Sequence, residues 1–108
     1  MPKDDRVYVG HMLDIAKKAV KLLGGKSRAE FDADEALLLG LTHLIQTLGE
    51  AARKVTPGYQ VAHPGIPWKE IVGMRNKVVH DYLDVNPDIV WHVAKEELSP
   101  LIRKLEGI

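Results

Sequence analysis

The chain has 108 residues, of which 45% are hydrophobic and 28% charged. This composition is typical of one folded globular domain over residues 1–108 and excludes a disordered protein. There is no cysteine, which excludes disulfides, thiolate metal sites and thiol nucleophiles. Fifteen basic and fifteen acidic residues give a net charge of zero. Any contact with nucleic acid must therefore be local, because the chain as a whole does not attract phosphates over long distances.

The N-terminal segment MPKDDRVYVG contains two acidic residues and no apolar core, so it does not resemble a secretory signal. The longest nearly apolar stretch, residues 36–41, is far shorter than the roughly 20 residues that cross a bilayer. We expect no membrane segment. Together with the absence of cysteine, this favours the cytoplasm, a reducing compartment.

Apolar residues recur at steps of three and four in four segments, which predicts four amphipathic helices. The first helix is expected from about Asp4 to Leu23, where Gly24-Gly25 ends it. The second follows the acidic residues 32–35 and continues to Val55. Thr56-Pro57-Gly58 is a stop signal, and we expect residues 58–66 to form a loop.

The third helix is expected to begin at Pro67 and to continue to Tyr82. Asn86-Pro87-Asp88 predicts the start of the fourth helix, which Pro100 should kink. No segment shows the alternation of a strand. The sequence therefore predicts an all-α, up-and-down four-helix bundle with a kinked last helix.

Arg75, His80 and Tyr82 are a chemically sufficient set for cleaving a phosphodiester. Histidine side chains titrate near neutrality and can move the proton of a ribose 2′-hydroxyl or of a leaving 5′-oxygen. Arginine offers a permanent positive charge and a donor fork to the phosphate. Neither role needs a metal, and we expect no cofactor.

The spacing of these residues is difficult to reconcile with one straight helix. At about 100° per residue, Arg75 and His80 lie roughly 140° apart, whereas Arg75 and Tyr82 lie within about 20°. Either the helix loosens before His80, or a second copy contributes the missing group across a two-fold interface. We favour a homodimer, in which the helix can also loosen before His80. Pairing of this helix would also gather Lys69, Arg75 and Lys77 of each copy around one groove.

Purely structural roles compete with the catalytic interpretation. Arg75 can pair with a carboxylate of the bundle, here Glu50 or Asp81, and a histidine near a helix C-terminus favours the helix dipole. Glu50 and Arg53 are three residues apart and can form an ordinary surface pair, or they can lie beside the cleft.

The other histidines and the tryptophans have simpler explanations. The histidines are scattered without the spacing of a metal site, so we expect structural or surface roles and no metal. The two tryptophans more often pack a bundle than stack on bases. These residues are His11, His43, His63, His92, Trp68 and Trp91.

Residues 75–82, RNKVVHDY, resemble the Arg-x4-His-x-Tyr motif of the HEPN superfamily in its HepT-like toxin branch. The segments LGEAA at 48–52, IPW at 66–68, DRVY at 5–8 and HML at 11–13 are also similar to that branch. The resemblance covers most of the chain.

The resemblance implies a metal-independent endoribonuclease toxin that cuts RNA in a shared dimer cleft and leaves cyclic-phosphate ends. Arg75 and His80 match the family's catalytic positions. Such proteins are typically paired with an MntA-like nucleotidyltransferase antitoxin, which attaches AMP to the motif tyrosine, here Tyr82. Asn76 and Asp81 suit positions that orient the phosphate or the histidine.

Two other functions stay open from the sequence. The chain can be a non-catalytic HEPN binding module that partners a nucleotidyltransferase, which predicts tight binding without cleavage. It can also be a nucleotide-binding helical domain that uses Arg75 to hold a small ligand. The intact motif favours the ribonuclease.

Overall fold

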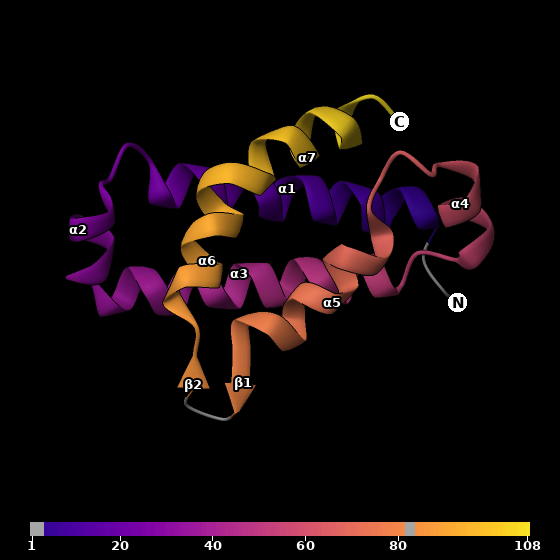
Figure 1. Cartoon of the computed structure of the whole chain (residues 1–108). Coiled ribbons are helices and arrows are strands. Elements are labelled where there is room, and N and C mark those ends of the chain that lie inside the picture. Colours follow the sequence, from indigo (N-terminus) through magenta and orange to yellow (C-terminus); the bar gives the residue numbers. More distant parts are fainter. Residues whose placement is uncertain (1–3, 82–83) are drawn as a thin grey trace.

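The computed structural model describes residues 4–81 and 84–108, and the side chains within this part except those of residues 79–81. Helices α1 (Asp5–Leu23) and α3 (Glu35–Arg53) lie side by side and run in opposite directions (Figure 1). Helix α5 (Trp68–Val78) packs on α3, and α7 (Leu98–Glu106) packs on α1. The molecule measures 42 × 28 × 22 Å. The predicted helical class is confirmed.

The caps of the first long helices follow the sequence signals. The Asp4 side chain accepts a hydrogen bond from the Arg6 backbone N–H at 2.8 Å and begins α1. Gly24, with a φ of 56°, ends it, because glycine adopts this left-handed backbone without steric cost. Asp34 caps α3 by accepting from the Leu37 N–H.

Two short helices were not predicted. Helix α2 (Arg28–Asp32) lies between α1 and α3, where its Ser27 and Glu30 form a reciprocal capping box. It buries Phe31. Helix α4 (Pro57–Ala62) occupies residues 58–62 of the expected loop, so the prediction was wrong for these residues and is confirmed for 63–66. Thr56-Pro57 follows the end of α3 at Arg53, as expected of a stop signal, and is also the cap and first residue of α4.

The last helical segment is not one continuous α-helix. Helix α6 (Pro87–His92) continues through a π-helical turn, η1 (Val93–Glu97), into α7. The chain changes direction between α6 and α7, and the irregular turn precedes Pro100 (Figure 1). Pro100 lies in the first turn of α7, directly after this irregular turn, and it has no N–H to donate to the carbonyls of η1. The Leu98 N–H bonds to the Val93 carbonyl, one residue further back than in an α-helix.

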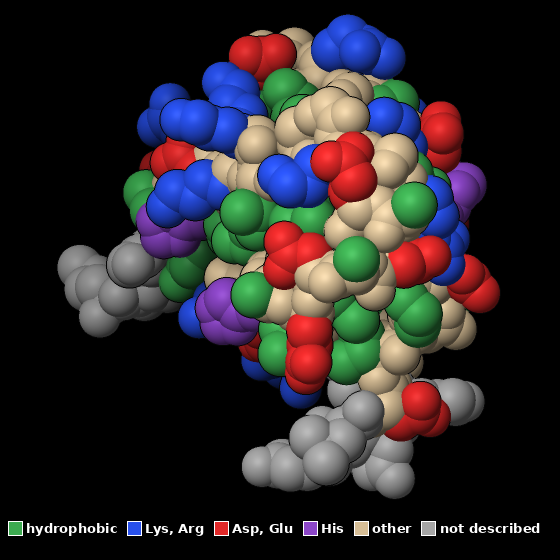
Figure 2. Space-filling view, turned by 90° about the vertical axis from the view of Figure 1, so that its left-hand side faces the viewer, with side chains coloured by type: hydrophobic (Ala, Val, Ile, Leu, Met, Phe, Trp, Pro, Cys, Tyr) green, Lys and Arg blue, Asp and Glu red, His purple; other side chains and the backbone are tan. Residues whose placement is uncertain are grey.

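The core is a continuous set of apolar side chains from every long helix. The largest that are fully buried are Phe31, Met12, Leu41, Ile45, Leu48, Ile71, Leu98, Val78 and Val90. No helix in the described part of the chain is both long and apolar enough to cross a membrane. Figure 2 shows Lys and Arg most frequent at one upper corner of the α2 end of the molecule, with acidic side chains spread over the same face. This face therefore presents no single-sign field.

Candidate functional site

Arg75 lies in the last turn of α5, and its guanidinium pairs with the Glu50 carboxylate of α3. Glu50 also accepts a hydrogen bond from Arg53 at 3.1 Å, so one carboxylate joins two arginines. The pairing of Arg75 with a bundle carboxylate was one of the structural alternatives. However, the Arg75 side chain is 46% exposed, and it is therefore accessible to a phosphate from solvent.

The position of Arg75 depends on Gly49, which lies where α5 approaches α3. A Cβ atom at residue 49 would lie 3.1 Å from the Ile71 carbonyl oxygen and 3.4 Å from the Arg75 Cβ. Any larger residue would require α5 to move by a few tenths of an ångström, so glycine fits this approach best. The next residue, Glu50, is thereby placed directly beside Arg75.

The predicted third helix ends earlier than expected. Helix α5 stops at Val78, and residues Val79–Asp81 form strand β1, which pairs antiparallel with β2 (Asp84–Val85). The expectation that the helix reaches Tyr82, and that no strand forms, was therefore wrong. Strands of three and two residues are too short to show alternation in the sequence. The backbone N–H of Asn86 closes this hairpin on the Val78 carbonyl at 2.9 Å.

His80 occupies an irregular position in this hairpin. Val79 is paired with Val85 and Asp81 with Asp84, so β1 has one more residue than β2 between these pairs. His80 is that extra residue, as in a β-bulge. The calculated 140° between Arg75 and His80 therefore does not apply, because the helix ends before His80. The side chains of His80 and Asp81, and all of Tyr82, lie outside the described residues.

Asn76 and Lys77 take no part in the Arg75–Glu50 pair. Together with Asp84, Val85 and Asn86, they line a groove of about 430 Å³ at the base of the hairpin. Arg75 and Lys77 thus face different neighbours within one chain.

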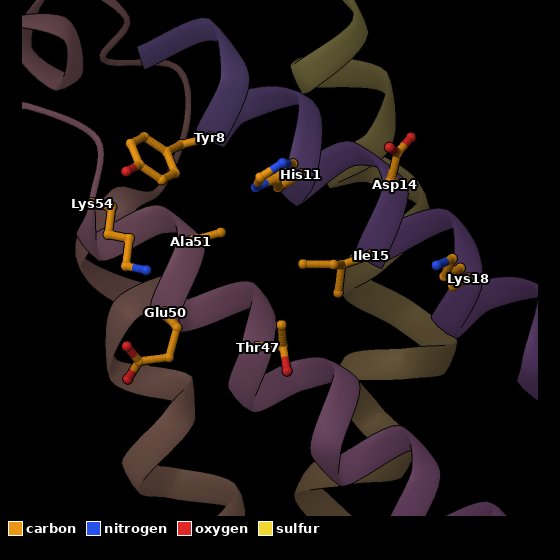
Figure 3. A pocket seen from close by; sticks show the side chains of 9 residues that line it. All are labelled: Tyr8, His11, Asp14, Ile15, Lys18, Thr47, Glu50, Ala51 and Lys54. Carbon is orange, nitrogen blue, oxygen red and sulfur yellow. The ribbon is translucent and has the colours of Figure 1, made fainter. Parts of the chain in front are cut away.

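A second groove was not predicted. It lies between α1 and α3, has a volume of about 430 Å³, and includes Tyr8, His11 and Lys54 as well as Glu50 (Figure 3). The repeat of polar and aromatic residues along one side of α1 was a signal for it in the sequence. His11 had been assigned only a structural or surface role.

Histidines and carboxylates do not gather into a metal site elsewhere in the described part. There, no group of three or more His, Asp or Glu side chains is placed to hold a metal ion. His92 instead pairs with Glu97 at 3.2 Å, and Tyr59 stacks near His63. Trp68 is buried, and its indole N–H donates to the His63 carbonyl.

The groups with shifted pKa values lie at helix starts and at the α2–α6 contact. Hydrogen bonds from the Ser27 backbone and side chain hold the pKa of Glu30 below its usual range. Hydrogen bonds to Asp88 and then to Asp32 raise the pKa of Arg28. Arg28 also lies over the rings of Phe31 and Trp91, so it ties α2 to α6.

The fold and the candidate site define a helical domain that carries an exposed arginine in the last turn of α5, five residues before a histidine in an irregular hairpin. The family model HepT-like, which is described as "Ribonuclease HepT-like", matches residues 12–108. The chain belongs to this HepT-like ribonuclease family, within the HEPN superfamily.

Individual relatives agree over almost the whole length. "Putative RNase TTE0752" of Caldanaerobacter subterraneus subsp. tengcongensis is 30% identical over 98% of this chain and 95% of the relative. "Probable ribonuclease HepT" of Thermococcus cleftensis is 29% identical over 95% of this chain and 96% of the relative. "Putative RNase MJ1216" of Methanocaldococcus jannaschii is 28% identical over 100% of this chain and 90% of the relative. No solved structure matches the chain.

Proposed function

We propose that this protein is a metal-independent endoribonuclease in which Arg75 and His80 act on one phosphodiester. The observation that carries the proposal is the end of α5 at Val78, which takes His80 off the helix that carries the exposed Arg75. On a straight helix the two residues would point in different directions around the helix axis. Because α5 ends before His80, this obstacle does not apply. Membership of a ribonuclease family supports the substrate class.

In the proposed reaction the ribose 2′-oxygen attacks the adjacent phosphorus, and the bond to the 5′-oxygen breaks. One neutral His80 imidazole takes the proton of the 2′-hydroxyl, and a second His80, in its protonated imidazolium form, gives its proton to the leaving 5′-oxygen. The products are a 2′,3′-cyclic phosphate and a 5′-hydroxyl. Arg75 donates to the phosphate oxygens as negative charge increases on them.

The need for two imidazoles is the reason to propose a homodimer. Each chain supplies one His80, and an isologous interface would bring the two copies around a shared cleft. Asn76 and Asp81 are proposed to orient the phosphate and the imidazole. Lys77 and Arg53 are proposed to line the edges of the cleft.

The Arg75–Glu50 pair gives a simple account of the resting site. Glu50 holds the guanidinium in place and is itself shared with Arg53, so the two arginines exceed the single carboxylate in charge. An incoming phosphate competes with Glu50 for Arg75. The arginine is therefore positioned before RNA arrives and stays available to it.

We further propose that the protein is the toxin of a type VII-like toxin–antitoxin pair. An MntA-like nucleotidyltransferase would transfer AMP from ATP to the Tyr82 hydroxyl and release pyrophosphate. An added phosphate beside Arg75 would occupy the guanidinium and exclude RNA. With a nucleotidyltransferase and ATP present, wild type should be silenced, whereas Tyr82→Phe should keep cutting.

The decisive experiment incubates purified protein, shown by mass spectrometry to be unmodified at Tyr82, with labelled RNAs in chelator. Arg75→Ala and His80→Ala should each lower cleavage by about a hundredfold or more, because each removes transition-state charge stabilisation or proton transfer. His43→Ala and Arg103→Ala are the controls, since both side chains are exposed and belong to other elements. Metal-dependent cleavage, or cleavage that both motif variants retain, would contradict the proposal.

A second function is favoured by one observation, the Arg75–Glu50 ion pair itself. If Arg75 serves only to join α3 and α5, the chain is a non-catalytic module that binds a nucleotidyltransferase. Absence of cleavage by unmodified wild-type protein, together with tight binding to the nucleotidyltransferase, would establish this alternative. Retention of that binding in Arg75→Ala would locate the contact elsewhere on the bundle.

A further inference from the structure

A polar groove runs between α1 and α3, next to the Arg75–Glu50 pair. Figure 3 shows Tyr8 and His11 along α1, opposite Glu50 on α3 and Lys54 at the C-terminal cap of α3. Its volume, about 430 Å³, is within the roughly 300–1,000 Å³ of small-molecule sites. We call this hollow the α1/α3 groove.

Helical spacing aligns the side chains of the groove. Tyr8, His11, Ile15 and Lys18 follow one another at steps of three and four, so they lie on one side of α1. One side of α3 and its C-terminal cap face them with side chains at the same helical spacing, namely Thr47, Glu50, Ala51 and Lys54. The floor is apolar where Ala51 is buried, and the rims carry rings and charges.

The groove is continuous with the candidate site through Glu50. This side chain lines the groove and also binds Arg75, the proposed phosphate ligand. A nucleotide chain whose phosphate is held at Arg75 would therefore place its neighbouring nucleotide beside Glu50. The α1/α3 groove is the concave surface that this neighbouring nucleotide would contact.

The groove contains two aromatic rings and two lysines, which suit a nucleotide, together with the carboxylates of Asp14 and Glu50. The rings of Tyr8 and His11 meet edge to face, with centroids 6.1 Å apart, and the Lys54 ammonium lies 5.9 Å from the Tyr8 ring centroid. Lys18 and Lys54 form no ion pair with any carboxylate that the structure describes. Both ammonium groups are thus free to meet phosphates.

We propose that the α1/α3 groove binds one nucleotide of single-stranded RNA, next to the phosphate held at Arg75. The base packs against Tyr8 and His11, and Lys18 and Lys54 contact the flanking phosphates. Single-stranded RNA is bound by this combination of aromatic surfaces and backbone-tracking cations. The proposal rests on the ribonuclease function and adds to it a place for the substrate outside the motif.

The excess of positive charge that the proposal needs lies at one end of the groove, because Lys18 and Lys54 are matched in number by the carboxylates Asp14 and Glu50 within the groove itself. Near its Glu50 end, one carboxylate is shared by Arg53 and Arg75, and Lys54 adds another positive charge. The surplus is local, so it acts at contact distance rather than over the whole surface.

The test measures binding of a fluorescein-labelled, single-stranded RNA to the His80→Ala protein in chelator, at several salt concentrations. In this cleavage-deficient background, Lys18→Gln with Lys54→Gln should weaken binding about tenfold at low salt. The slope of log affinity against log salt should fall by about 1.4, because each lost phosphate contact on a single strand contributes about 0.7. Tyr8→Leu with His11→Ala should also weaken binding about tenfold, with the slope unchanged.

The matched control is Lys95→Gln with Lys104→Gln. It removes the same charge from exposed lysines on η1 and α7, which are not part of the groove. This control should leave the salt slope unchanged. RNA carrying 4-thiouridine should crosslink, on irradiation, to the peptide of residues 7–17. Circular dichroism verifies that every variant is folded.

The outcomes separate this proposal from the ribonuclease function. If wild type cuts RNA but the groove and control variants bind equally, the groove proposal is wrong and the ribonuclease stands. If the groove variants fall apart from dimers into monomers in sedimentation, the groove is a contact between copies, which also overturns it. If RNA neither binds nor is cut, both proposals fail together.

Discussion

The two halves of the motif are held in different ways. Arg75 belongs to a helix that packs on α3, and its place depends on the close approach at Gly49 and on the Glu50 carboxylate. His80 belongs to a short hairpin, whose place depends on backbone pairs and on the Asn86 N–H bond to Val78. Helix packing fixes a side chain through many small contacts, whereas a two-residue pairing fixes it through a few hydrogen bonds. A change can therefore affect one half and spare the other.

The largest effect is expected where α3 meets α5. Gly49→Leu would push its side chain into the Ile71 carbonyl and the Arg75 Cβ, and should lower the free energy of unfolding by about 3 kcal/mol. Urea denaturation measures this. Gly73→Ala, in α5 with nothing within 4 Å of an added Cβ, is the control and should instead stabilise by about 1 kcal/mol. Equal stability of the Gly49→Leu and wild-type proteins would show that the close approach is not needed.

A smaller effect is expected at the hairpin. The Asn86 side chain accepts from the N–H groups of Asp88 and Ile89 and caps α6, so Asn86→Ala should cost about 1 kcal/mol. In this variant, hydrogen exchange of the backbone N–H of residue 86 should accelerate, while exchange of the backbone N–H groups in α3 should not. Asn76→Ala, at an exposed position of α5, should change stability by less than about 0.5 kcal/mol. Faster exchange throughout α3 would show that the two halves are not independent.

Glu50→Gln tests the link between Arg75 and the substrate. The ion pair is partly exposed, so its loss should change stability by less than about 1 kcal/mol. Glutamine keeps an acceptor for Arg75 and removes a negative charge near the phosphate. RNA should therefore bind the His80→Ala, Glu50→Gln protein about fivefold more tightly at low salt, since such a repulsion is worth about 1 kcal/mol. Glu70→Gln, on another side of α5, should not change affinity; weaker binding in Glu50→Gln would contradict the competition.

The smallest effect concerns acid stability far from the motif. The pKa of Glu30 is lowered because its carboxylate accepts from the Ser27 backbone N–H. A lowered folded-state pKa means that the stabilisation is complete above the ordinary carboxyl range and is lost as pH falls through the lowered value. Glu30→Gln should thus be less stable than wild type at pH 7, with a difference that diminishes on acidification. If the stability difference between the two proteins instead grew as the pH fell, folding would not lower the pKa of Glu30.

The sequence predicted the parts of this fold that have a long period or a strong cap. Apolar repeats located the four main helical segments, and Asp4, Gly24 and Asn86 marked boundaries that the structure has. It did not predict α2 or α4, because helices of five and six residues contain too little of a 3.6-residue period. Ser27-x-x-Glu30 was nonetheless a readable capping box for α2.

The candidate site was predictable as a set of residue types and not as a geometry. Spacing identified Arg75 and His80, and it also exposed the conflict that a straight helix creates. It did not locate the end of α5 at Val78, because the apolar stripe continues through Val79. Tertiary pairing with β2 decides that boundary. The groove with Tyr8 and Lys54 depends on two helices far apart in sequence, which spacing within one helix cannot align.

The π-helical turn at Val93–Glu97 gives the domain a tolerance to changes in length. A loop closed by the Leu98 N–H on the Val93 carbonyl contains one residue more than an α-helical loop. Removing one residue here would leave an ordinary helix, with Leu98, Leu101 and Leu105 still directed at their present neighbours. A deletion within α1 or α3 would instead rotate everything beyond it by about 100°. Single-residue gaps among natural variants of this chain are therefore expected to collect at this turn.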